Sequence, residues 1–159
     1  MSPAQRAALE SLVGASLSEE QVAAIDPLLA DGRYPSIAAV LSPLRFVVQP
    51  RMTSARGLAA LMPGGPYVAE AVMRKLEGAR DSLLASSDEQ QKVLGSLLRR
   101  QLGFLASDGL DFGSAALRSM LDQFAALGIL TAGEVAGLKS IARQNAPISD
   151  VEVRAALEQ

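Results

Sequence analysis

The chain of 159 residues is long enough for one domain with a sizeable core, and 49% apolar residues exclude a disordered protein. It contains neither histidine nor cysteine, which excludes disulfides, the usual zinc sites and nearly all nucleophile–base pairs. The net charge of −2 arises from acidic ends, residues 1–31 and 105–159, around a basic middle, residues 32–104. We therefore expect a single helical domain over 1–159 that is not an enzyme and holds neither cofactor nor metal.

In chain order, the first predicted helices cover residues 3–14, 18–31 and a short stretch from Pro35 to Pro43. Ser18 is followed three residues later by Gln21, the spacing of a capping box, in which each residue satisfies a backbone amide of the other. The apolar residue before the cap, Leu17, can pack on Val22 as a hydrophobic staple. Helix starts are well marked by this signature, so a helix should begin at Ser18.

Residues 44–52 break the helical pattern. The aromatic and β-branched run 46–48 favours an extended backbone, and flanking prolines limit any strand to about six residues. No second strand-like run is evident in the sequence. The segment is therefore either a connector within the chain or an edge that adds a strand to the sheet of another chain. In the second case the candidate partner contact consists of Arg45, Phe46, Val47, Val48 and Arg51.

The middle of the chain predicts a helix over 54–61, a Pro-Gly-Gly-Pro turn, and two long helices over 66–84 and 88–106. Leucines at helical spacing predict one shared core, to which Leu76, Leu94, Leu97, Leu98, Leu102 and Leu121 should contribute. Four basic residues could form a strip away from that core: Arg80, Lys92, Arg99 and Arg100. Such a strip contacts nucleic acid or an acidic partner, or is an ordinary solvated face. The sequence pI of about 5.2 and the few aromatic residues argue against nucleic acid.

A glycine-rich loop over 107–113 and three further helices, 114–127, 131–143 and 149–158, complete the predicted elements. Thr131 and Ser149 repeat the capping box and staple of Ser18. The stretches 17–42 and 130–157 also share a pattern, which predicts an acidic helical hairpin at each end, by duplication or by shared capping rules. The expected fold is all-α, a compact multi-helix domain of about seven or eight helices with one short extended segment near 44–52.

Neither a membrane partner nor export is expected. No apolar run reaches the roughly 18–20 residues of a membrane span, and the start of the chain lacks the basic and apolar parts of a signal peptide. The cytoplasm is therefore the expected location.

Four stretches carry a resemblance to a known group of proteins: LDFGSAALRSMLDQFAALGILTAGEVAGLKSIA, SDVEVRAAL, SLSEEQVAAIDPLLADGRYPSIAAVLS and RFVVQPRMTSARGLAALM. In their capping and apolar patterns they resemble small helical proteins of tailed bacteriophages. The resemblance implies a virion structural or assembly protein that contacts other protein subunits, either copies of itself or virion components, in the virion or the host cytoplasm. The alternative is a small regulator or inhibitor that binds a host protein, or nucleic acid, through the basic middle. The resemblance assigns no functional residue.

Overall fold

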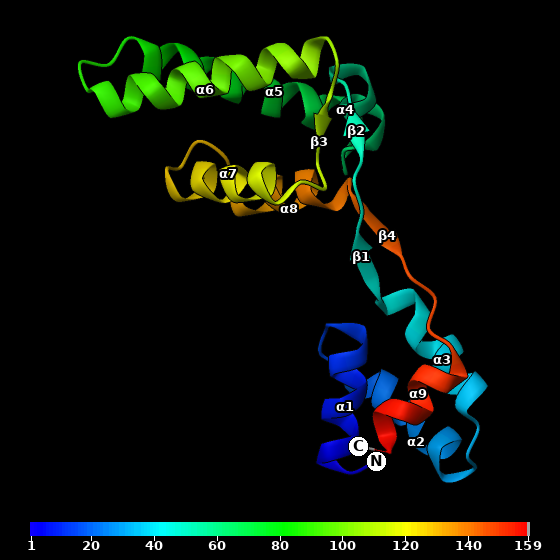
Figure 1. Cartoon of the computed structure of the whole chain (residues 1–159). Coiled ribbons are helices and arrows are strands. Elements are labelled where there is room, and N and C mark those ends of the chain that lie inside the picture. The colour runs from blue at the N-terminus through cyan, green and yellow to red at the C-terminus, as the bar shows by residue number, and fades with distance from the viewer. Residues whose placement is uncertain (159) are drawn as a thin grey trace. The chain divides into compact units, whose positions relative to one another are not determined.

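The computed structural model of the protein describes residues 1–158, and its fold is predominantly helical (Figure 1). Over this range it has nine α-helices, one 3₁₀ helix and four short strands. The predicted all-α class is confirmed, with more helices than the seven or eight expected. The short extended segment near 44–52 is also present.

The contacts divide the described chain into two compact units. Unit 1 consists of residues 1–48 and the chain from 144 onward, and unit 2 is the continuous insertion 49–143. Each unit has its own cluster of buried apolar side chains. Both units are helical, so the periodicity of the sequence does not mark the boundary between them. The expectation of one domain over 1–159 stays a prediction, namely that the two units fold together.

Unit 1 is built from helices at both ends of the chain. Its elements are α1 (Pro3–Val13), α2 (Glu19–Ala30), α3 (Tyr34–Leu41), η1 (Ser42–Leu44), β1 (Phe46–Val48), β4 (Arg143–Asn145, which begins at the unit boundary) and α9 (Asp150–Leu157). Helix α9 packs against α1 and α3, and α2 packs against α3. The most deeply buried side chains of this core are Leu9, Ile25, Ile37, Leu41 and Val153.

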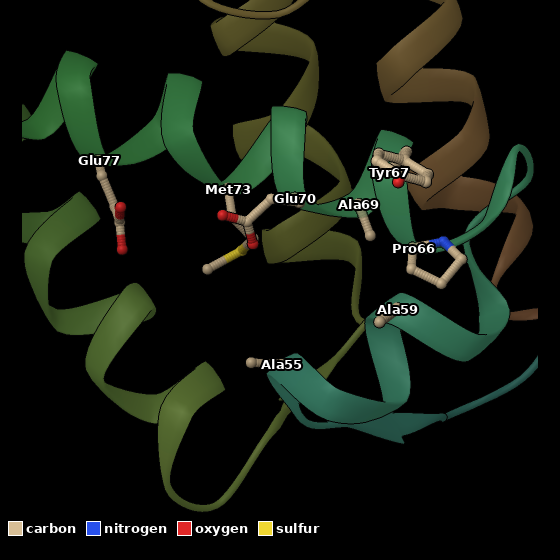
Figure 2. A pocket seen from close by; sticks show the side chains of 8 residues that line it. All are labelled: Ala55, Ala59, Pro66, Tyr67, Ala69, Glu70, Met73 and Glu77. Atoms are coloured by element: carbon tan, nitrogen blue, oxygen red, sulfur yellow. The ribbon is translucent and has the colours of Figure 1, made fainter.

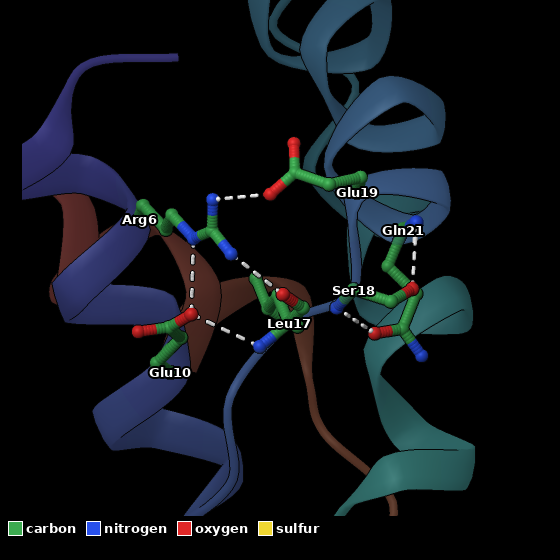
Figure 3. Close-up of polar contacts among 6 residues, drawn as sticks. All are labelled: Arg6, Glu10, Leu17, Ser18, Glu19 and Gln21. Atoms are coloured by element: carbon green, nitrogen blue, oxygen red, sulfur yellow. Dashed lines mark hydrogen bonds and ion pairs between the residues drawn. The ribbon is translucent and has the colours of Figure 1, made fainter.

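The turn from α1 into α2 is fixed by one arginine (Figure 3). Arg6 donates to Glu10 and Glu19, at 3.0 Å each, and to the Leu17 carbonyl at 2.7 Å. The Leu17 amide donates back to Glu10 at 3.0 Å. This backbone bond, together with Arg6, lowers the pKa of Glu10 below its usual value. The network holds Leu17 buried beside the start of α2, the position from which it can pack on Val22 as the predicted hydrophobic staple.

The three predicted helix starts are confirmed. Ser18, Thr131 and Ser149 are N-caps, each accepting from the third helical amide at 3.2 Å and each completing a capping box. Their staple residues lie in the apolar clusters of the two units. A fourth capping box, Ser2 with Gln5, opens α1. The sequence carries the same signal there, in Ser2 and Gln5, although the helix predicted over 3–14 rests on Pro3.

Unit 2 is the insertion between β1 and β4. Its elements are β2 (Met52–Thr53), α4 (Ala55–Leu61), α5 (Gly65–Leu84), α6 (Glu89–Ala106), β3 (Leu110–Asp111), α7 (Ala115–Ala126) and α8 (Ala132–Ser140). The long helices α5 and α6 lie side by side (Figure 1), α4 packs on α5, and α7 packs on α8. A Cβ on Gly95 of α6 would come within 2.9 Å of the Leu84 backbone nitrogen, so only glycine permits this approach to the end of α5.

The predicted leucine core is largely confirmed. Leu76, Leu98, Leu102 and Leu121 are buried in the cluster of unit 2, and Leu94 packs against it. The inward placement of Leu97 is wrong, because this side chain is 44% exposed. Leu97 and Leu98 lie about 100° apart around α6, and the helix buries only one of the two.

Two expectations about strands were wrong. Segment 44–52 does have partners in the chain: β1 pairs with β4, and β2 pairs antiparallel with β3, with Thr53 opposite Leu110. Strand β3 lies inside the predicted loop, and β4 follows α8, which ends at Ser140 instead of 143. The partner strands lack β-branched residues. Pairing uses backbone groups, and tertiary structure determines which segments supply them.

The predicted C-terminal hairpin is also not formed within one unit. Helix α8 belongs to unit 2 and α9 to unit 1, with β4 between them. The stretch 17–42 thus lies within unit 1, whereas 130–157 contributes to both units, and whether their shared pattern arises by duplication or by capping rules stays a prediction.

Leu98→Ala should lower the free energy of unfolding by about 2–5 kcal/mol, since it removes a fully buried side chain and leaves a cavity. The adjacent change Leu97→Ala should cost no more than about 1 kcal/mol. Urea unfolding of both variants measures the difference. Equal losses would contradict the burial described for α6.

Residues 49–143 expressed alone should fold, because their apolar cluster is complete and their ends are adjacent. The Gln49 amide donates to the Ala142 carbonyl at 3.0 Å. We expect a helical circular dichroism spectrum and a cooperative thermal transition. An unfolded fragment would show that both units fold as the one domain expected from the sequence.

Candidate functional site

An open groove of about 460 Å³ lies between α4 and α5 in unit 2 (Figure 2). Helix α4 contributes two alanines one turn apart, and α5 contributes side chains from its first four turns. The lining residues are Ala55, Ala59, Pro66, Tyr67, Ala69, Glu70, Met73 and Glu77. We call this the α4–α5 groove.

The chemistry of the groove combines a small-residue, apolar floor with two carboxylates. Glu70 is paired with Arg74 on the same helix, Nε to Oε1, at 3.0 Å. Glu77 makes no ion pair within residues 1–158. Tyr67, at one end, is 92% exposed. Such a surface fits an apolar segment that carries positive charge, and it offers no nucleophile with an adjacent base.

The outer face of α6 carries large apolar side chains. Val93, Leu97 and Phe104 are 60%, 44% and 44% exposed. Their spacing of four and seven residues places them in one line along the helix, and Arg100 falls in the same line between Leu97 and Phe104. We call these four residues the α6 stripe. Helix α6 is thus apolar on two sides, with the stripe away from the core of unit 2.

The predicted basic strip is only partly available to a partner. Arg80 lies on α5 and is paired with Asp81 at 2.8 Å, a bond that raises the pKa of Arg80. Lys92 on α6 is paired with Glu89 at 2.7 Å. Arg99 and Arg100 are exposed and have no ion pair among the described residues. Two of the four cations therefore have no acidic partner within the described chain.

The predicted partner contact in segment 44–52 is divided between the units. Phe46, Val47 and Val48 form β1 in unit 1 with exposed side chains, whereas Arg51 belongs to unit 2. The Arg51 amide donates to Asp111 Oδ1 at 2.7 Å. Because β1 already pairs with β4, the chain uses it as a connector. Its docking on another protein stays a prediction.

Arg45, the remaining residue of that contact, is engaged inside unit 1. Its guanidinium is 2.7 Å from Glu152 of α9. Glu152 also closes the capping box of α9, accepting from the amide of Ser149. Arg45 first, and then Ser149, lower the pKa of Glu152 from 4.5 to about 2.

The groove and the stripe were not found from the sequence. The stripe has a visible signal, because Val93, Leu97 and Phe104 repeat at helical spacing. Of these three residues only Leu97 is given a place from the sequence, in the predicted core, and Val93 and Phe104 are given no role. The groove depends on which alanines of α4 face α5, and the sequence offers no signal for this.

No protein-family model matches the chain, and neither a curated protein nor a solved structure matches it. The resemblance to tailed-phage proteins therefore stays a prediction. None of the helices in residues 1–158 is both long and apolar enough to cross a membrane. In the same range, no three acidic side chains cluster closely enough to hold a metal ion.

Glu152→Gln should lower the thermal midpoint at neutral pH, because it removes the carboxylate that binds Arg45 and caps α9. The pKa of Glu152 is lower in the folded chain than its usual 4.5, so its contribution is present above about 4.5 and disappears as the pH falls toward about 2. The difference between wild type and variant should therefore shrink over that interval. Calorimetry over pH 2–7 measures it, with Glu158→Gln at the C-cap of the same helix as control; a pH-independent difference would contradict the assignment.

Proposed function

We propose that the protein is a non-enzymatic structural or assembly protein of a tailed bacteriophage, which acts through contacts with other protein subunits in the virion or the host cytoplasm. The observation that carries this proposal is the α6 stripe. Three large apolar side chains and an arginine without an acidic partner in the described chain occupy one line of an exposed helix face.

Single exposed apolar residues are ordinary on protein surfaces, but a contiguous set indicates a binding surface. Protein interfaces are enriched in aromatic residues and arginine, and the residues that contribute most lie near their centres. Phe104 and Arg100 are of these types and are one turn apart on α6. The stripe therefore has the composition of an interface, not that of a solvated helix face.

The chemistry of the chain also supports a binding protein. The sequence offers no histidine or cysteine as general base or nucleophile, and the carboxylates of the α4–α5 groove stand beside alanines, a methionine and an exposed tyrosine. A surface of this kind fits recognition of another protein better than turnover of a substrate.

The second candidate is a small regulator or inhibitor that binds one host protein through the basic middle of the chain. The exposed and unpaired Arg99 and Arg100 favour it, since they suit an acidic partner. Unit 2 holds eleven basic and nine acidic residues, a net charge of +2, which is too little for a nucleic-acid-binding surface. An assembly protein should occur in repeated copies within a particle, whereas an inhibitor should form a stable complex with a single host protein.

The double variant Leu97→Gln, Phe104→Gln should remain folded but lose its association with other subunits. Both side chains are exposed in the isolated chain, so their removal should leave the helical signal and thermal midpoint nearly unchanged. Sedimentation velocity over a concentration series measures association, and particle composition measures incorporation.

Leu127→Gln is the matched control, because Leu127 is an exposed leucine of unit 2 outside the stripe. It should associate as wild type does. If the stripe variant and this control behave alike in both assays, the stripe is not a binding surface and the proposed function loses its support.

A further inference from the structure

We propose that the α6 stripe of one copy docks antiparallel into the α4–α5 groove of a second copy. This inference rests on the proposed function and names the partner of the same surface: another copy of this chain. It is carried by a match of length, residue spacing and charge between two surfaces of unit 2 that share no residue.

The two surfaces have the same spacing. Six positions of α5 line the groove, and four of them, 66, 70, 73 and 77, follow one another in steps of four, three and four; the other two are Tyr67 and Ala69. On α6 the stripe occupies positions 93, 97, 100 and 104, with the same steps. Each set spans eleven residues, or about 16 Å at 1.5 Å per residue. One helix face can therefore follow the other over its whole length.

The antiparallel register also matches the chemistry. It places Arg100 opposite Glu70, and Leu97 opposite Met73. The one unmatched pair is Val93 with Glu77, at the end of the groove. Phe104 falls opposite Pro66, next to the exposed ring of Tyr67. The parallel register would place Leu97 on the Glu70 carboxylate and Arg100 on the Met73 thioether, which would desolvate both charges without a partner.

The groups that would pair are available in the single chain. Arg74 contacts Glu70 through Oε1 only, and both side chains are largely exposed, so this pair stabilises the helix little and leaves Oε2 to accept from Arg100. On the floor of the groove, Ala55 and Ala59 are small and let a helix approach α4 closely. Charge and shape therefore both favour an incoming stripe.

Self-pairing of two stripes is less favourable. In an antiparallel pair of α6 helices the midpoint of the stripe falls between residues 98 and 99. Arg100 of both copies would then meet near the two-fold axis, where like charges repel. In contrast, the contact of stripe with groove is heterologous, since each copy keeps one free stripe and one free groove. Such contacts build rings or open filaments.

The test is complementation between two damaged surfaces in the full chain. The stripe variant is Leu97→Gln, Phe104→Gln, and the groove variant is Glu70→Arg, Met73→Gln. Sedimentation velocity up to about 1 mM protein covers the range of weak contacts. Wild type should form species larger than a dimer, and each variant alone should be monomeric. An equimolar mixture should stop at a heterodimer, because it holds only one intact stripe and one intact groove.

A charge reversal tests the register. Arg100→Glu and Glu70→Arg should each weaken association at least about tenfold, and the two changes in one chain should restore it. Asp31→Arg, an exposed reversal at the C-cap of α2 in unit 1, should have no effect on association. Circular dichroism and thermal melting of every variant should match wild type.

The outcomes separate this inference from the proposed function. A groove variant that associates like wild type, a mixture that remains monomeric, or a reversal without recovery overturns the docking of stripe on groove. A wild type that is monomeric up to about 1 mM also overturns it. In each of these cases the proposed function is still supported if the stripe variant fails to enter particles. It is contradicted if the stripe variant enters particles like the Leu127→Gln control.

Discussion

The fold of the chain depends most on one constraint: α9, which follows unit 2 in the sequence, must pack in the core of unit 1. Ile148 and Val153 lie in the core of unit 1, and without them Leu9, Ile37 and Leu41 would lack cover from α9. The chain must therefore come back after the whole of unit 2 has been inserted. Within unit 2 the amide of Gln49 donates to the carbonyl of Ala142. The first and last residues of the insertion are therefore adjacent.

Polar bonds in unit 1 then fix the returning chain. Ser42 Oγ accepts from the Ile148 amide at 2.9 Å, and the Ala146 amide donates to the Arg45 carbonyl at 2.9 Å. The side chain of Arg45 adds its ion pair to Glu152. These bonds join residues more than 100 positions apart, so loop closure must precede them, and the sequence gives no local sign of it.

The capping carboxylates connect local and tertiary structure. Glu134 and Glu152 each close a capping box, and each also accepts from a distant cation, Lys75 at 2.6 Å and Arg45 at 2.7 Å. Lys75 lowers the pKa of Glu134 as Arg45 does that of Glu152. The same carboxylate that caps the start of a helix thus also holds that helix against another element of its unit. In α2, where the capping box has a neutral Gln21, Arg6 makes the tertiary connection through Glu19 and Leu17 instead.

Local physics explains which parts of the structure could be predicted. Ser18, Thr131 and Ser149 were assigned as N-caps from sequence because the capping box uses residues only three positions apart. The leucines of α5 and α6 were assigned because helix periodicity is also local. The pairing of β1 with β4 and the division into two units depend on contacts between segments far apart in the chain. The composition of β1 favours an extended backbone, but that of β4 carries no such signal. The same reason hid the α4–α5 groove, which requires two helices to be placed before it exists.

Helix α6 shows most clearly how a correct local pattern can lead to a wrong assignment. Its apolar residues satisfy the helical period on two faces, and periodicity alone cannot say that only one face meets the core of unit 2. Leu98 is buried and Leu97 is exposed, although each continues an apolar line along the helix. An amphipathic helix needs only one such line to fold. A second line adds exposed apolar area without adding to the core of unit 2, and the contact with another copy proposed above would account for it.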